Sequence, residues 1–189
     1  MLAAWGNEAA ARLSGGGGGA VGSTAPSAPG VKNADFKLTG TDGNVISADN
    51  GIVVQKSLVP YIESMIGGRL QGIDGITGDG TEYLVVTGCS SNSAITNDFF
   101  DAFEQMISDG DQVLYREVGG DFNSEFYGVN GYLVSVNINI EQINKTDGEY
   151  YYRNDSDDLK MSVEQCIVHE FAHSYQQYEN LAGRTPCFT

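Results

Sequence analysis

Histidine and cysteine are scarce in this chain, and their scarcity narrows the kinds of site it can hold. Two histidines and three cysteines occur among 189 residues. The cysteines, Cys89, Cys166 and Cys187, are odd in number and form no CxxC pair, so neither a disulfide scaffold nor a zinc knuckle is indicated. A disulfide between two of them stays open.

Basic residues and long apolar runs are also lacking. Ten Lys and Arg residues stand against 25 Asp and Glu residues, and the formal net charge is -15. This charge repels phosphate backbones and anionic lipid head groups, so we expect no nucleic-acid partner. The chain has no apolar run of about 18 residues, which excludes a membrane-spanning helix.

The first residues lack a conventional secretory signal. They read MLAAWGNEAAARL, without a basic flank followed by an apolar segment. Residues 14–30 then read SGGGGGAVGSTAPSAPG, which buries too little apolar surface to offset the conformational entropy of an ordered chain. We therefore expect residues 1–30 to form a disordered leader or linker and residues 31–189 to form a single domain. Such a linker suggests a module of a larger polypeptide.

Apolar residues at helical spacing predict two helices in the first half of the domain. One lies within residues 52–66, and Pro60 indicates a late start or a kink in it. The other begins at Thr96 or Asn97, which are typical N-caps, and stops at the turn formed by Asp109 and Gly110.

Three segments have the pattern of strands. Residues 82–87 and 112–118 are short apolar runs rich in residues that favour strands. From Tyr132 to Ile140, apolar and polar residues alternate with a period of two. The polar alternate face predicts an edge strand or a sheet that is covered on one side only. Strands interspersed with helices in this way predict an α+β fold.

The last predicted helix carries the residues with the clearest chemical signature. Ser162 and Gln165 form a capping box that opens this helix. His169, Glu170 and His173 then form an HExxH motif, which uses both histidines of the chain. Residues four apart project from one side of a helix, so both imidazoles can reach one metal ion.

Glu170 follows the first histidine by one position, about 100 degrees round the helix. Its carboxylate is thereby directed beside the metal toward a bound water. A zinc ion lowers the pKa of water and polarises a scissile carbonyl, while a neighbouring carboxylate acts as general base and passes the proton to the leaving amine. The motif therefore predicts a zinc site in which Glu170 is the catalytic residue.

The rest of this helix has the amphipathic pattern that such a site requires. Its aromatic and aliphatic residues form a stripe roughly opposite the histidines: Ile167, Phe171, Tyr175 and Tyr178. One face can then pack into the core while the other lines a cleft. Cys166 lies on the histidine side but one turn too early for the metal, which favours a buried thiol.

These residues resemble the active-site helix of the zincin metallopeptidases, and the match is specific to this helix. The resemblance implies zinc as cofactor, a protein or peptide substrate and a zincin-like α+β fold. In that fold the edge strand of a small mixed sheet packs on the active-site helix and pairs with extended substrate; residues Tyr132–Ile140 are the candidate edge. With the Gly-rich linker in front, the chain is also similar to metallopeptidase toxin or effector domains at the ends of larger secreted bacterial proteins, which implies export.

The third protein ligand of a catalytic zinc is less evident than the first two. Zincins that read HExxHxxGxxH/D carry it six residues after the second histidine, and here that position is Glu179, with Gln176 in place of the glycine. On a straight helix Glu179 points about 100 degrees away from the histidine pair. It can therefore bind zinc only where the helix bends or ends near Gln177.

Other residues are open as third ligands. Asp155, Asp157 and Asp158 lie in the polar loop before the helix. Cys89, in a Gly-Cys-Ser setting, resembles the cysteine ligand of the peptide deformylases, which also use HExxH.

A second hypothesis from another class is a non-catalytic binding or structural module of a larger secreted protein, in which the histidines are incidental or the metal is structural. It predicts that Glu170→Gln leaves function intact, whereas a peptidase loses activity.

Overall fold

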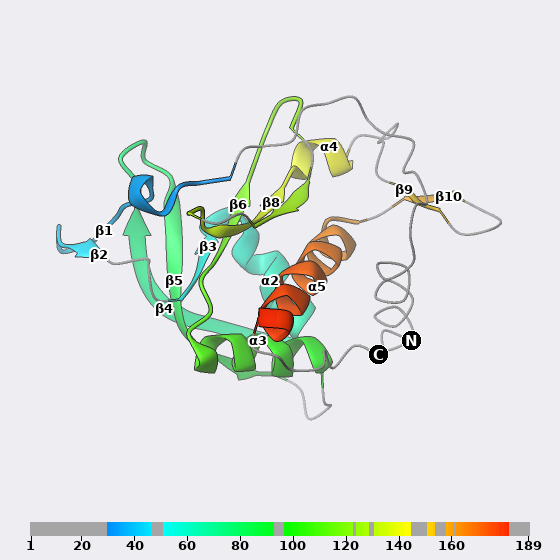
Figure 1. The fold of residues 1–189 in the computed structure, drawn as a ribbon, viewed down its shortest axis with the longest axis horizontal. Helices are drawn as coiled ribbons and strands as arrows, with labels where there is room; N and C mark the ends of the chain where they lie inside the picture. Colours follow the sequence, from blue (N-terminus) through cyan, green and yellow to red (C-terminus); the bar gives the residue numbers. More distant parts are fainter. Residues whose placement is uncertain are drawn as a thin grey trace.

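The described part of the chain forms one curled sheet with helices packed on one of its faces (Figure 1). The structure is a computed structural model. It describes residues 30–46, 51–92, 97–122, 124–128, 131–144, 151–153, 158–160 and 162–181, with the backbone alone for 151–153, 158–160, 174 and 176–181. The expected leader or linker over residues 1–30 lies outside the described residues apart from Gly30.

The sheet has eight strands in the order β2-β1-β4-β5-β3-β6-β8-β7, and β9 and β10 form a separate pair. The strands are β1 (Leu38–Gly40), β2 (Val45–Ile46), β3 (Ile52–Gln55), β4 (Gly68–Ile76), β5 (Glu82–Ser91), β6 (Val113–Glu117), β7 (Glu125–Tyr127), β8 (Val134–Ile138), β9 (Tyr151–Arg153) and β10 (Asp158–Lys160). The α-helices are α2 (Val59–Ile66), α3 (Asp98–Asp109), α4 (Ile140–Asn144) and α5 (Val163–Leu181), and short 3-10 turns are formed by η1 (Asn33–Asp35) and η2 (Lys56–Leu58).

The strand directions make this a mixed sheet. β6 runs parallel to both of its neighbours, β3 and β8, and the other neighbouring strands are antiparallel. The α+β class and the mixed sheet expected from the sequence are therefore confirmed, although the sheet is larger than the small one expected. Within the described residues, none of the helices has the length and apolar character needed to cross a membrane.

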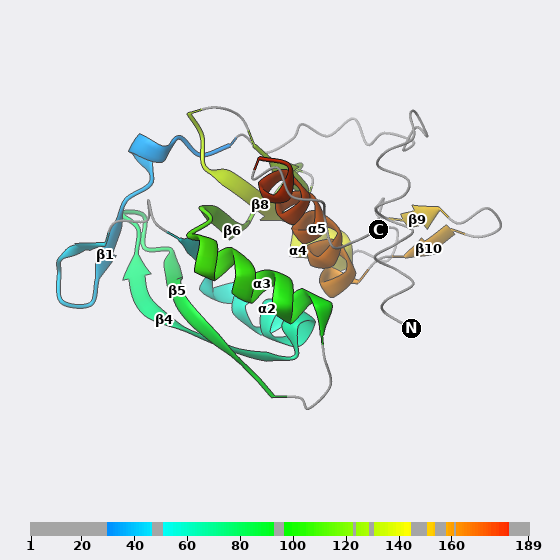
Figure 2. The same cartoon turned by 60° about the horizontal axis from the view of Figure 1, so that its bottom comes forward.

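Two hydrophobic cores lie on the two faces of the sheet. The larger core lies between the sheet and the three longer helices, α2, α3 and α5, which gather on one face (Figure 2). The smaller core, on the other face, contains Leu38, Tyr83 and Leu114. Successive residues of a strand alternate between the cores, so that Val53 belongs to the smaller core and Val54 to the larger.

The prediction of a helix within residues 52–66 is correct only for the second half of this segment. Ile52–Gln55 form β3, a central strand, and the prediction of helix there was wrong. The first three residues of β3 are all buried because both faces of a central strand are covered, and a continuous apolar run does not distinguish a buried strand from a helix. Pro60 lies in the first turn of α2, which is the late start expected, and Gly67 ends the helix with a φ of 59°.

Asn97 both begins α3 and connects it to α2. Its side-chain oxygen accepts hydrogen bonds from the backbone N–H groups of Phe99 at 2.9 Å and Phe100 at 3.4 Å, which confirms the expected N-cap. Its Nδ2 donates to the carbonyl oxygen of Met65 at 3.1 Å, near the end of α2. The Asn97 side chain thus connects the start of α3 to the end of α2.

Asn97→Ala is expected to lower the free energy of unfolding by about 2 kcal/mol, about half from the lost cap and half from the lost bond to Met65. Asn97→Asp is the matched control, because it keeps the capping oxygen but has no Nδ2, and it should lose about 1 kcal/mol. Urea unfolding curves of the two variants measure the difference. Equal losses would contradict a contribution from the cap.

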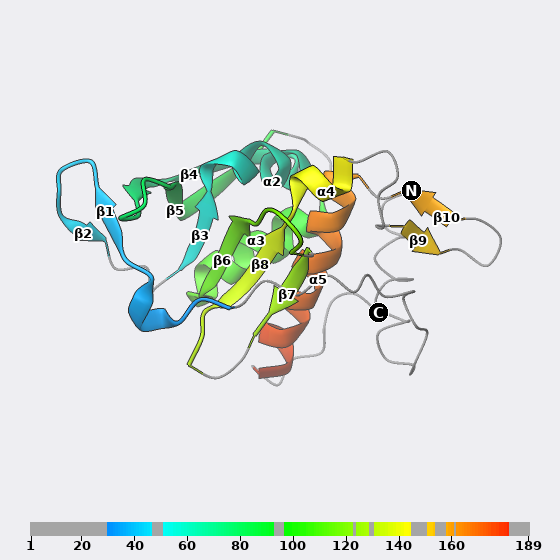
Figure 3. The same ribbon diagram turned by 90° about the horizontal axis from the view of Figure 1, so that it is seen from above.

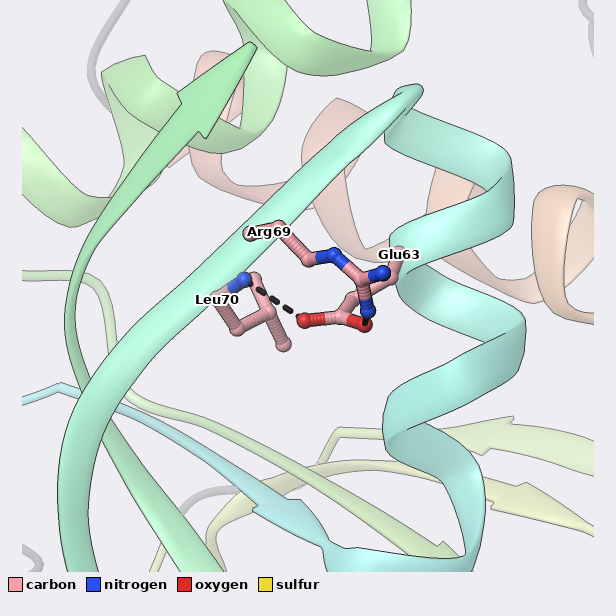
Figure 4. Close-up of polar contacts among 3 residues, drawn as sticks. All are labelled: Glu63, Arg69 and Leu70. Atoms are coloured by element: carbon pink, nitrogen blue, oxygen red, sulfur yellow. Dashed lines mark hydrogen bonds and ion pairs between the residues drawn. The ribbon is translucent and has the colours of Figure 1, made fainter. Parts of the chain in front are cut away.

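A second contact connects α2 to the sheet. Glu63 turns back from α2 toward the start of β4, where one carboxylate oxygen accepts from the Leu70 backbone N–H at 2.9 Å and the other from Arg69 Nη1 at 2.7 Å (Figure 4). This part of β4 pairs with β5 only, so the carboxylate supplies an acceptor that no neighbouring strand provides. Glu63 therefore protects the edge of β4.

The strand expected at Tyr132–Ile140 is shorter than predicted and is not an edge. It corresponds to β8, which lies between β6 and β7, and Ile140 begins α4. The polar alternate face is also buried: Ser135, Asn137 and Asn139 are fully covered. Asn137 Oδ1 accepts from Arg116 Nε at 2.6 Å, and Asn139 Nδ2 donates to the Phe122 carbonyl at 2.7 Å. Ser135 Oγ and Asn137 Nδ2 are buried without a hydrogen-bond partner among the described residues. Both predictions for this face were wrong.

Candidate metal centre

Helix α5 begins and packs as its sequence indicates. The backbone N–H of Ser162 donates to Gln165 Oε1 at 2.7 Å, and the Gln165 N–H donates to Ser162 Oγ at 3.2 Å, so the capping box is confirmed. Ile167, Phe171 and Tyr175 are buried in the larger core. The Phe171 ring lies against the rings of α3, 5.9 Å from Phe99 and 6.0 Å from Phe103 between centroids. The side chain of Tyr178 lies outside the described residues.

The two histidines of α5 converge on one another. Their ring centroids are 4.8 Å apart with the planes at 88°, and the Nε2 atoms of His169 and His173 are 3.3 Å apart. Burial lowers the pKa of His169, and burial together with the neighbouring His169 lowers the pKa of His173 to about 4. Both imidazoles are therefore neutral at pH 7, with nitrogen lone pairs available.

This separation fits a shared zinc ion. Two imidazole nitrogens that each lie about 2.0–2.1 Å from a tetrahedral zinc are roughly 3.3 Å apart, and the Nε2 atoms of His169 and His173 are 3.3 Å apart. Neutral imidazoles also bind a metal without first losing a proton. Without a metal, the same distance allows a hydrogen bond between the two rings, in which one Nε2 donates and the other accepts. His169 and His173 would thus be the residues that hold the ion.

The side chain of Glu170, which lies between the two histidines in sequence, points into the protein interior. Only 8% of its surface is exposed, and burial raises the pKa of its carboxyl to about 7, with the nearby charge of Glu125 adding to the increase. The backbone N–H of Phe126 donates to the carboxylate and opposes this increase. A carboxyl group with a pKa close to neutrality can both accept and return a proton, which is the property of a general acid–base group.

The edge strand beside α5 is β7, which the sequence did not reveal. β7 pairs with β8 on one side only and lies along α5 (Figure 3). Phe126 is its central residue, and its ring is stacked on His173 with centroids 6.1 Å apart and planes at 27°. The edge strand packed on the motif helix is thus β7 and not the Tyr132–Ile140 strand, which was the wrong candidate.

Two polar residues that the sequence did not single out, Ser124 and Asn139, connect the start of β7 to α5 and α4. Ser124, just before β7, accepts from the Asn139 backbone N–H at 2.8 Å and bonds to Cys166 on α5. The Asn139 side chain donates to the Phe122 carbonyl at 2.7 Å and accepts from the Gln142 N–H at 3.0 Å, which caps α4. An asparagine before a helical turn is a recognised capping signal, but here it was masked by the alternation of the strand.

Neither of the cysteines with described side chains joins the two histidines in a cluster of possible metal ligands. Cys166 is buried, as expected, and burial raises the pKa of its thiol to about 12. Cys89 is half-buried in β5. Among the residues whose side chains are described, no third His, Cys, Asp or Glu gathers with the histidines, so Cys89 is not brought to them. Cys187 lies outside the described residues.

The other third-ligand candidates lie where side chains are not described. Helix α5 continues through Glu179 to Leu181, so the helix does not end near Gln177, but the side chain of Glu179 is outside the described residues. Asp155 and Asp157 are outside them altogether, and Asp158 begins β10 with only its backbone described.

No protein-family model, no curated protein and no solved structure matches this chain. The resemblance to zincins therefore depends on the sequence of α5 alone.

Proposed function

We propose that this protein is a zinc-dependent peptidase that hydrolyses peptide bonds of a protein or peptide substrate. The observation that carries the proposal is the 3.3 Å separation of the Nε2 atoms of His169 and His173, which suits a shared tetrahedral zinc. The lowered pKa values of both imidazoles support it, because each ring is ready to bind a cation at neutral pH.

In the proposed reaction each residue of the motif has a separate role. His169 and His173 bind the ion. Zinc, when bound, supplies a Lewis acid that polarises the scissile carbonyl and acidifies water. Glu170 accepts a proton as the nucleophile attacks and returns it to the departing amine. Burial raises the pKa of its carboxyl to about 7 without metal, and a bound cation would lower it, which keeps the carboxylate ionised and able to accept a proton at neutral pH.

Strand β7 supports a peptide rather than a small molecule as substrate. It is the outermost strand of the sheet on the side of α5, and it contacts both Glu170 and His173 through Phe126. An extended peptide can pair with the free side of an edge strand, which would bring its backbone alongside the motif.

Metal analysis of purified protein tests the proposal. After incubation with zinc and removal of excess metal, wild-type protein should retain about one zinc per chain, and His173→Ala should retain none. Glu164→Ala, on the first turn of the same helix, is the matched control and should retain as much as wild type. Glu179→Gln and Asp158→Asn in the same measurement test two candidate third ligands. A wild-type protein without zinc, or His173→Ala with full zinc, would overturn the metal site.

A further inference from the structure

The inference concerns Phe126, the central residue of β7. It pairs with Val136 of β8, a fully buried residue of the larger core, so both side chains lie on the sheet face that α5 covers. The Phe126 ring is half-buried, packs against that core and is stacked on the imidazole of His173. The backbone N–H of the same residue bonds to Glu170. One residue of the edge strand therefore contacts two of the three motif residues.

The two histidines differ in how they are held. The His173 ring is stacked on Phe126 with centroids 6.1 Å apart and planes at 27°, and it meets His169 edge to face at 88°. A ring in this position covers one face of the imidazole and disfavours rotation of the His173 side chain toward β7. Metal affinity increases when a ligand is held in its binding orientation before the metal arrives, because less conformational freedom is lost on binding.

We propose that Phe126 is a positioning residue of the metal centre: its ring holds the His173 imidazole in the orientation that converges with His169. The inference rests on the proposed function, since it assigns Phe126 a part in binding the same ion. It also makes β7 a component of the centre, in addition to any part it has in pairing with substrate.

The imidazole signals of the zinc-free protein test the orientation without any metal. The chain has only two histidines, so ¹³C-labelled histidine gives two sets of ring signals, which His169→Gln assigns. In wild type the His173 ring protons should show ring-current shifts and NOEs to the Phe126 ring. Phe126→Leu should move the His173 signals and leave those of His169 nearly in place. Tyr127→Leu is the matched control, because Tyr127 is the next residue on β7 and its ring lies on the opposite face against Tyr132.

Zinc affinity, measured by competition with a chromophoric chelator, tests the consequence. Phe126→Leu should bind zinc roughly 3- to 10-fold more weakly than wild type, the size expected for one aromatic stacking contact. Phe126→Tyr keeps the ring and should restore the affinity, and Tyr127→Leu should stay close to wild type. Should Phe126→Leu fail to fold, the NOEs between the His173 and Phe126 rings of wild type decide whether the two rings are held together, and their absence would overturn the positioning role.

The failures of the two proposals are distinguishable. Unchanged His173 signals and unchanged zinc affinity in Phe126→Leu overturn the positioning role while the zinc site stands. A wild-type protein that binds no zinc overturns the proposed function, and the NOEs and ring signals then decide alone whether Phe126 orients His173. Equal effects of Phe126→Leu and Tyr127→Leu would overturn the positioning role in favour of general packing.

Discussion

Glutamine in place of Glu170 is expected to lower peptide hydrolysis by roughly 10²- to 10⁴-fold while the protein still binds zinc. Glutamine has nearly the same shape, and its side-chain oxygen can still accept the Phe126 N–H that bonds to the carboxylate. It cannot take up a proton, so it removes the general base without removing a ligand. The measurement is kcat/KM of the zinc-loaded protein on a peptide library or on casein, at pH 7 and above.

Two controls make this result interpretable. Glu164→Gln makes the same chemical change on the first turn of α5, away from the histidines, and should keep the activity of wild type. The zinc content of Glu170→Gln should equal that of wild type, which shows that the centre is intact. A Glu170→Gln protein that hydrolyses peptide as fast as wild type would overturn the catalytic role of Glu170. A wild-type protein that binds zinc and does not hydrolyse peptide would instead favour a non-catalytic module in which the metal is structural.

Local signals in the sequence were sufficient to predict α5, its capping box and the convergence of its two histidines. The capping box, the apolar stripe and the spacing of His169 and His173 all depend on residues within one or two helical turns, and helical geometry alone relates them. The N-cap of α3 was predicted for the same reason. Such features do not depend on how distant parts of the chain meet.

The sheet was predicted less well because its strands are held by distant partners. β7 has three residues, none fully buried, and no periodic pattern; it is a strand because it pairs with β8. β4 was missed because its glycines and polar residues give no strand signal, whereas its pairing with β5 extends over its whole length. Strand propensity depends strongly on such context.

The burial of the polar face of β8 also could not be predicted from the residues of that strand alone. Alternation of apolar and polar residues normally indicates that one face meets water. Asn137 and Asn139 are instead buried, because Arg116 and the backbone around residues 120–124 supply hydrogen-bond partners. Those partners come from other segments of the chain, so the residues of β8 alone could not reveal them. The same network holds β7 beside α5.

The zinc-free protein is expected to become less stable, relative to Glu170→Gln, as the pH rises from about 4.5 to about 7. Burial raises the folded-state pKa of Glu170 from 4.5 to about 7. Over this range the unfolded chain has released the proton and the folded chain retains it, so the free energy of unfolding falls with rising pH and levels off above the folded pKa. At 1.36 kcal/mol per pKa unit, the loss is about 3 kcal/mol.

Urea unfolding with a chelator present, at several pH values between 4 and 8, measures this difference. Subtracting the free energy of unfolding of Glu170→Gln from that of wild type removes the contribution of the histidines, which both proteins share. The lowered pKa values of the histidines act in the opposite direction, because the unfolded chain takes up their protons first as the pH falls below 6.5. Zinc should flatten the dependence, because a cation beside the carboxylate favours its ionised form. A difference that does not change with pH would mean that Glu170 is ionised in the folded protein at pH 5 and that burial does not raise the pKa of its carboxyl.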